Sequence, residues 1–214
     1  MKIHLFFTFI ILLILNGCIE YSEEIWLNSD LSGKARLKIG LTQAVKESIG
    51  ESRSIDNLES GFLINSGVKL ISKKKYTNNG MEVVDVKMSF ESFSDFLKGQ
   101  SKANLDSYRA IKNEQGILDI SRDIKVDEEN ESADQTQFGD MVETVFSAYI
   151  WNFTIHFPGK ILHSNADSVD YANNTMYWTY SLYDLMNNPF KLEGKSIAVE
   201  KNIQTIFDWI ELEK

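Results

Sequence analysis

The sequence is poor in cysteine, in proline and in positive charge. One Cys among 214 residues excludes a disulfide scaffold and a zinc site built from cysteines, and two Pro exclude a proline-rich linker protein. Lys and Arg number 22 against 31 Asp and Glu, which gives a formal net charge of −9. Nucleic-acid-binding proteins and polybasic membrane-surface modules both need a field that attracts phosphate, so this charge argues against both classes. The hydrophobic fraction of 43% is high enough for a globular domain with a buried core.

The single cysteine follows the longest apolar run of the sequence. Residues 5–15 are apolar except for Thr8, and Lys2 stands before them. This run is shorter than the roughly 17–25 residues that cross hydrocarbon, and its length is typical of a signal-peptide core. Residues 15–18, Leu-Asn-Gly-Cys, then resemble the lipobox of bacterial lipoproteins, although the Asn departs from the residue usual at its position. In such a motif the cysteine, here Cys18, receives lipid.

The lipobox predicts how the chain is processed and where it resides. Residues 1–17 are expected to be a cleaved signal peptide, and residues 18–214 an exported domain. Cys18 would carry a diacyl group on its sulfur and an acyl chain such as palmitate on its amine, and two chains already hold a protein stably on a membrane. The protein is therefore expected in the bacterial cell envelope, anchored to a membrane and exposed to the periplasm or the cell exterior. An ordinary secretion signal with an incidental cysteine is the alternative.

Period-two alternation predicts two strands at the start of the exported domain, joined by a turn at residues 29–33. The apolar residues of the first strand share one face, and those of the second alternate again: Ile19, Tyr21, Ile25 and Leu27, then Ala35, Leu37, Ile39 and Leu41.

The clearest hairpin signal is the segment 68–90, in which two strands flank Thr77-Asn78-Asn79-Gly80. A two-residue Asn-Gly loop would set Val86 against Lys73 and Val84 against Lys75. A three-residue loop, Asn78 to Gly80, would instead oppose Phe90 with Val68, Met88 with Leu70 and Val86 with Ser72, which gathers apolar residues on one face. We therefore expect the three-residue loop.

The remaining chain predicts more antiparallel strands and a few short helices. A hairpin is expected over 107–126, and further strands at 149–157, 174–182 and 194–200. Short helices are expected at 42–49, 55–64, 91–98, 138–149 and 202–210, and the acidic segment 126–137 is expected to be a solvated loop. The predicted fold class is α+β, an antiparallel meander of β-hairpins with the helices packed on one face.

Two stretches resemble the LppM-like family of bacterial envelope lipoproteins. The first is Cys18 followed directly by a strand, a turn ending in Ser32-Gly33 and a second strand. The second is the block 155–161 (IHFPGKI), with Ser164-Asn165 and a strand centred on Trp178. The resemblance implies a non-enzymatic exported α+β domain that contacts envelope lipids or glycolipids. Many members also carry a C-terminal transmembrane helix; no second apolar run occurs here, so a single anchor is expected.

An aromatic concentration between residues 146 and 183 is the strongest candidate for ligand binding. Strand spacing places most of these rings in the core, but successive residues of a strand face opposite sides of the sheet, so some of the rings are expected to be exposed. An aromatic side chain with an apolar face and a polar tip suits acyl-chain boundaries, sugar faces and protein partners. The candidate ligand-binding residues are Trp151, Tyr177, Trp178 and Tyr180.

Lys73, Lys74 and Lys75 are candidates for contacting anionic lipid head groups, since each lysine near such a surface contributes about 1 kcal/mol. The alternative is that Glu82 and Asp85 on the opposing strand neutralise part of this charge.

Catalytic and metal-binding signals are weak. His156 falls on the polar side of its strand and His163 in a loop, which is poor evidence for a metal site, so neither metal nor cofactor is expected. The sequence has no HExxH motif, GxSxG motif or phosphate-binding glycine loop, and we do not expect an enzyme. The favoured function is a lipid-anchored, non-catalytic binding module for a lipid, glycolipid or other amphiphile. The alternative is a structural lipoprotein that binds another envelope or host protein.

Overall fold

A computed structural model describes residues 19–43, 46–47, 67–102, 108–124, 147–187 and 190–197. The signal peptide, Cys18, the acidic loop 126–137, and the helices expected at 55–64 and 202–210 lie outside the described residues. Of the helix expected at 42–49, residues 42–43 and 46–47 are described, and 43, 46 and 47 are helical; of the helix expected at 138–149, only 147–149 are described. Within the described residues, no helix is long and apolar enough to cross a bilayer.

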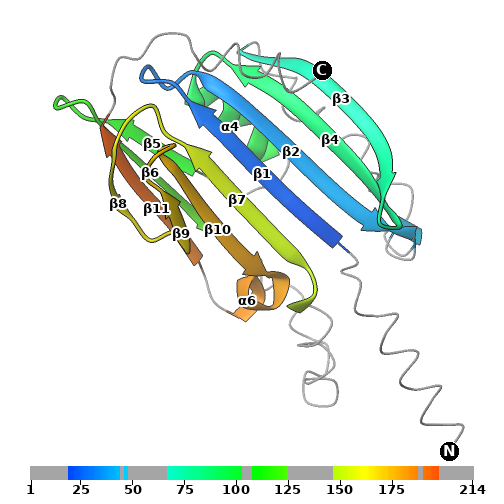
Figure 1. Ribbon diagram of the computed structural model, residues 1–214. Helices are drawn as coiled ribbons and strands as arrows, with labels where there is room; N and C mark the ends of the chain where they lie inside the picture. The colour runs from blue at the N-terminus through cyan, green and yellow to red at the C-terminus, as the bar shows by residue number, and fades with distance from the viewer. Residues whose placement is uncertain are drawn as a thin grey trace, which may run out of the picture.

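The larger of two β-sheets has the strand order β3-β4-β2-β1-β7-β10-β9 (Figure 1). Its neighbouring strands are antiparallel except for β1 and β7, which run parallel. The strands are β1 (Ile19–Leu27), β2 (Gly33–Thr42), β3 (Val68–Asn78), β4 (Met81–Phe90), β7 (Ile150–His156), β9 (Ser168–Asp170) and β10 (Thr175–Ser181).

The smaller sheet has the order β5-β6-β11-β8 and is antiparallel throughout. Its strands are β5 (Tyr108–Lys112), β6 (Ile117–Ile124), β8 (Ile161–Ser164) and β11 (Phe190–Ile197). Two helices lie wholly within the described residues, α4 (Phe93–Lys102) after β4 and α6 (Leu182–Asn187) after β10.

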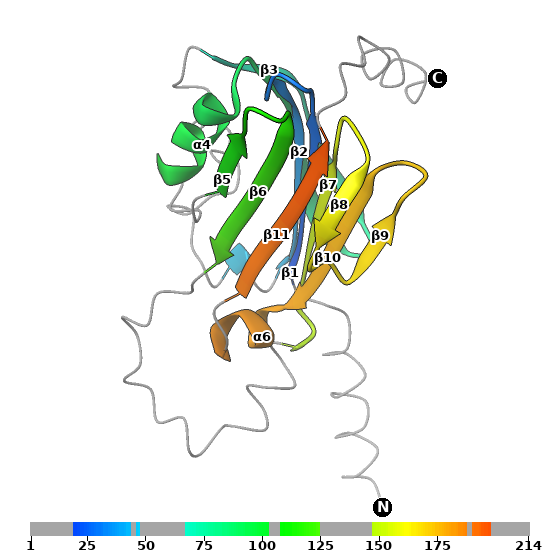
Figure 2. The ribbon, with the colours of Figure 1, turned by 90° about the vertical axis from the view of Figure 1, so that its left-hand side faces the viewer.

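The main core lies between the two sheets, which face each other in Figure 2. Ile25 and Phe153 of the larger sheet and Ile120 and Leu192 of the smaller sheet belong to one buried cluster. The predicted inward face of β1 is confirmed, because Tyr21, Ile25 and Leu27 are buried and Ile19 is partly buried.

The fold class predicted from sequence is correct only in part. The structure is mostly β, and a second sheet, rather than a layer of helices, covers most of one face of the first. Strand β11 explains why this was not foreseen. It begins at Phe190, four residues before the predicted start at Gly194. Its buried positions are Leu192, Gly194 and Ser196, and only the first of these is apolar, so apolar alternation is weak along the whole strand. A Cβ on Gly194 would lie 2.6 Å from the Met176 sulfur of β10, so a larger residue there would displace the Met176 side chain between the sheets.

The β3–β4 hairpin corrects the predicted loop. Its loop has two residues, Asn79 and Gly80, both with positive φ (48° and 77°), as a type I′ turn requires. Near the turn, Lys73 pairs with Val86 and Lys75 with Val84, which is the register that the sequence argument rejected.

A register shift between Leu70 and Ser72 reconciles the tight turn with the apolar pattern. It restores the predicted pairs Leu70–Met88 and Val68–Phe90, while Ser72 pairs with Lys87 and not with Val86. The extra residue of a β-bulge thus satisfies both constraints, which a search for one uniform register cannot find.

Candidate binding site

The predicted aromatic ligand residues divide between the two faces of the larger sheet. Trp151 pairs with Tyr180, and Trp178 with Phe153, on the face toward the smaller sheet. Tyr177 is on the opposite face and 37% exposed. The structure therefore brings Trp151, Trp178 and Tyr180 together and separates Tyr177 from them.

The inward aromatic residues are packed as core. We call Trp151, Phe153, Trp178 and Tyr180 the aromatic block. Trp178 is 1% exposed, and its Nε1 donates a hydrogen bond to Asn165 Oδ1 at 3.0 Å. The Trp151 ring lies 5.0 Å from that of Tyr21 and 6.3 Å from that of Phe153. Burial, with a smaller effect of Asp167, raises the pKa of Tyr180 to about 12.

The three candidate lysines of β3 alternate across the strand. Lys73 and Lys75 lie opposite the inward residues Val86 and Val84, whereas Lys74 lies opposite Asp85 on the other face. Lys75 Nζ is 3.6 Å from Glu82 Oε1, which agrees with the alternative that Glu82 neutralises part of the lysine charge. Glu82 also bonds Lys46 at 2.6 Å, and Asp85 accepts two hydrogen bonds from Arg36 of β2.

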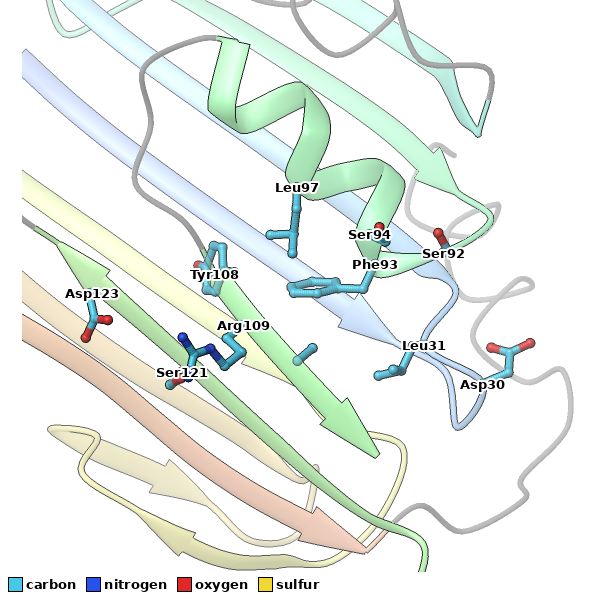
Figure 3. A pocket seen from close by; sticks show the side chains of 11 residues that line it. Asp30, Leu31, Ser92, Phe93, Ser94, Leu97, Tyr108, Arg109, Ser121 and Asp123 are labelled. Atoms are coloured by element: carbon cyan, nitrogen blue, oxygen red, sulfur yellow. The ribbon is translucent and has the colours of Figure 1, made fainter. Parts of the chain in front are cut away.

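A cavity of about 440 Å³ lies where α4 approaches β5 and the turn between β1 and β2 (Figure 3). We call it the α4 corner. One part of its wall is apolar and the other polar. The apolar lining is Leu31, Phe93, Leu97, Tyr108 and Ala110, and the polar lining is Asp30, Ser92, Ser94, Arg109, Ser121 and Asp123.

The start of α4 fixes the apolar wall. Ser92 caps the helix, because its Oγ accepts a hydrogen bond from the Asp95 backbone N–H at 3.2 Å and donates one to Asp95 Oδ2 at 2.7 Å. The helix that begins there buries Phe93 and Phe96 against Phe90 of β4 and places Leu97 in the cavity wall.

The β1–β2 turn closes the cavity from the other side. Asp30 Oδ1 accepts hydrogen bonds from the Ser32 backbone N–H at 2.9 Å and from its Oγ at 2.6 Å, and these lower the pKa of Asp30. Leu31 has a φ of 66°. Lys112 Nζ donates to the Ser29 carbonyl at 2.8 Å, which joins this turn to β5.

Beside the α4 corner lies a buried charged cluster that the sequence argument missed. Arg122 and Glu23 are each 1% exposed, and Arg122 Nη1 donates to Glu23 Oε2 at 2.9 Å. Tyr21 donates to the same oxygen at 2.8 Å. The guanidinium also lies 4.6 Å from the centre of the Tyr108 ring and 4.8 Å from that of Phe153. The cluster thus connects β1 with β6 across the two sheets.

Burial and the Glu23 carboxylate raise the pKa of both Tyr21 and Tyr108, so these hydroxyls stay protonated. Burial is the largest effect and disfavours the charged guanidinium of Arg122, but Glu23, Tyr108 and Tyr21 together outweigh it, so the pKa of Arg122 is raised. Sequence parity could have revealed both members of the ion pair. Glu23 shares the inward face of β1 with Tyr21, and Arg122 shares that of β6 with Ile120.

Tyr108 connects the buried cluster to the α4 corner, because its side chain lines the cavity and its hydroxyl oxygen accepts a hydrogen bond from Arg122 Nη1 at 3.3 Å. The corner therefore combines a fixed apolar wall with a polar rim of both charges. Such an arrangement suits binding of a molecule that has an apolar and a polar part.

The histidine considered as a metal ligand has other partners. His156 lies on the outer face of β7, with Nδ1 2.9 Å from Thr175 Oγ1 and Nε2 2.8 Å from Glu24 Oε1, and its ring stacks on Trp26. Over the described ranges, no three His, Cys, Asp or Glu side chains are grouped so that they could hold a metal ion.

No protein-family model matches the chain, and no curated protein matches its sequence. Among solved structures, the chain is similar to the NMR structure of the folded domain of LppM from Mycobacterium tuberculosis. The TM-score is 0.53, and the match covers 87% of this chain and 94% of that domain at 10% sequence identity. The chain has an LppM-like fold.

The residues that carried the sequence resemblance occupy structural positions in this fold. Asn165 links the sheets, because its Oδ1 accepts hydrogen bonds from Trp178 of β10 and from the backbone N–H of Glu193 of β11. Gly33 starts β2 where a Cβ would lie 2.1 Å from the Trp26 carbonyl oxygen. The residues that carried the resemblance therefore support the fold, and they do not line the cavity of the α4 corner.

Proposed function

We propose that this chain is a lipid-anchored protein of the bacterial cell envelope, and that its domain is a non-catalytic binding module for a lipid, glycolipid or other amphiphile. The lipobox at Cys18 and the LppM-like fold support the anchor. The α4 corner is the proposed binding site, in place of the aromatic block.

The observation that carries the binding proposal is the amphipathic lining of the α4 corner. Its volume of about 440 Å³ falls within the roughly 300–1,000 Å³ of small-molecule sites. Phe93 and Leu97 offer apolar surface to a chain or ring. Arg109 and Asp123 offer a donor and an acceptor to a zwitterionic or hydroxyl-bearing head group.

Native mass spectrometry of the full chain, purified from membranes in detergent, tests this binding. We expect a bound amphiphile that organic extraction releases. Leu97→Gln should lower its occupancy, because a polar amide replaces apolar lining. Lys98→Gln is the matched control, since Lys98 is on the same helix, exposed and outside the lining. Equal occupancy in both variants, or no bound amphiphile in the parent, would contradict the proposed site.

The anchor is tested separately by metabolic labelling with an alkyne analogue of palmitate. The full chain should incorporate the label and partition into membranes, and Cys18→Ala should lose both properties because no acceptor sulfur remains. Equal labelling of the two proteins would place the lipid elsewhere.

Strand β3 favours a second candidate function, the binding of another envelope or host protein. It is an edge of the larger sheet as described, and exposes Leu70 (42%), Ile71 (48%) and Tyr76 (41%). A strand edge of this kind can pair with a partner strand, although lysines and a bulge on an edge oppose such pairing. Crosslinking in the native membrane would decide for this function if β3 peptides join to one defined protein.

A further inference from the structure

Strand β1 separates the proposed anchor from the proposed binding site. Cys18 directly precedes Ile19, the first residue of β1. The strand ends at Leu27, and the turn that follows supplies Asp30 and Leu31 to the α4 corner. Nine residues at about 3.3 Å each place the two ends about 30 Å apart.

The strand register shows what lies beside the anchored end. Ile19 pairs with Leu41 of β2, Leu41 with Glu82 of β4, and Glu82 with Thr77 of β3. The β3–β4 turn is therefore at the same end of the sheet as the start of β1, toward the lower right of Figure 1.

The other half of the sheet continues this end. Glu20 of β1 pairs with Ile150 of β7, which pairs with Ser181 of β10, the residue before α6. At the opposite end, Leu27 pairs with Gly33, and Gly33 with Phe90, which precedes α4. The β1–β2 turn and the start of α4 thus lie at the end remote from Cys18, and the α4 corner extends from there to Tyr108, which lies at the level of Glu23 near the middle of β1.

We infer that the anchored domain stands with the β3–β4 turn and α6 toward the bilayer and with the α4 corner in its far half, so that the β1–β2 turn beside the corner is about 30 Å from the anchor. This inference rests on the proposed lipidation of Cys18. No residue separates Cys18 from β1, so the acyl chains hold the start of the strand at the membrane surface. Lys75 is three positions from Asn78 at the end of β3, so this orientation also brings the β3 lysines toward the head groups.

The orientation has a consequence for the ligand. The α4 corner faces the aqueous compartment and is out of reach of lipids that remain in the anchoring bilayer. Its occupant must therefore arrive from the aqueous side, either as a free amphiphile or from a second surface.

Fluorescence quenching by lipid-borne nitroxide tests the orientation. The lipidated full chain is reconstituted into vesicles of phosphatidylcholine and phosphatidylglycerol that contain a head-group nitroxide lipid. A single thiol-reactive fluorophore is placed through Asn78→Cys at the end of β3 or Glu114→Cys in the β5–β6 turn, both exposed positions. Because Cys18 sulfur is occupied by lipid, each variant has one reactive thiol.

We expect fractional quenching at position 78 to exceed that at 114 at least about threefold, because about 30 Å separates the two ends of the domain. Equal quenching, or stronger quenching at 114, would overturn the inference. Flotation of the unlabelled parent with the vesicles, without thiol labelling, reports the anchor independently. If the parent reacts with the thiol probe at Cys18 and does not float, the proposed anchor is refuted. If the parent floats but the two cysteine variants show the wrong order of quenching, only the orientation is refuted. Matching thermal unfolding of both variants and the parent confirms that the substitutions leave the fold intact.

Discussion

The aromatic block and the α4 corner are both rich in large side chains, but the block is packed as core and the corner lines a cavity. In the block, Trp178 and Phe153 are fully buried between the sheets, and the Trp178 nitrogen is hydrogen-bonded. In the corner, an edge strand meets a helix and a turn, and serines and charged residues interrupt the apolar lining. Aromatic density in this chain therefore marks the core, and the cavity lies where the second sheet ends.

Removing the central ring of the aromatic block should have the largest effect on stability. Trp178→Ala leaves a cavity and one fewer partner for Asn165, and should lower the free energy of unfolding by about 3–5 kcal/mol. Tyr177→Ala is the matched control on the exposed face and should cost about 1 kcal/mol or less. Urea unfolding monitored by circular dichroism gives both values. If the Trp178→Ala protein is stable but no longer binds the amphiphile, the aromatic block and not the α4 corner is the binding site.

The buried ion pair next to the corner should behave differently from an exposed one. Glu23→Gln leaves Arg122 as a buried cation without its carboxylate, which typically costs about 3–5 kcal/mol. Glu91→Gln removes the exposed pair with Lys69, whose N–O distance is a similar 2.8 Å, and should leave the free energy of unfolding almost unchanged because solvent screens this pair. The same unfolding measurement compares them. Equal losses would show that burial does not govern the strength of this pair.

High pH should weaken the fold modestly through the buried tyrosines. The pKa of Tyr180 is raised to about 12 and those of Tyr21 and Tyr108 are also raised, so the folded protein holds these protons more tightly than the unfolded chain. Their contribution is complete below the unfolded value of about 10. It is lost as pH rises from there through the folded pKa values. Tyrosinate absorbance should show Tyr180 titrating near pH 12, and Tyr180→Phe should remove part of this late change. Titration of every tyrosine near pH 10 would contradict this account.

Regular alternation made the central strands predictable, and departures from it hid the rest. Ile25 and Leu27 of β1, like Met176 and Trp178 of β10, lie where period-two spacing placed strands. In β11 only Leu192 of the buried positions Leu192, Gly194 and Ser196 is apolar, so the alternation was too weak to show the full length of the strand and its place in a second sheet. The tight Asn79-Gly80 turn was rejected because one extra residue at the bulge restores the apolar register only farther along the strand.

The candidate site was harder to predict than the fold, for a physical reason. Its lining comes from α4, from β5–β6 and from the β1–β2 turn, which are distant in sequence, so no local pattern contains it. Glu23 and Arg122 were overlooked because charged residues are rarely buried, yet each supplies the countercharge that makes the burial of the other possible. Only the pairing of the sheets shows that they meet.

Photocrosslinking tests the central claim, that the ligand binds in the α4 corner and not in the aromatic block. The probe is a lysophosphatidylcholine that carries a diazirine on its acyl chain, supplied as a monomer to the purified full chain and followed by peptide mapping. We expect adducts on the start of α4, at Phe93–Leu97, and on β5 around Tyr108–Ala110, with fewer adducts in the Leu97→Gln variant. Adducts on β7 or β10 in place of these would contradict the account and return the ligand to Trp151 and its neighbours.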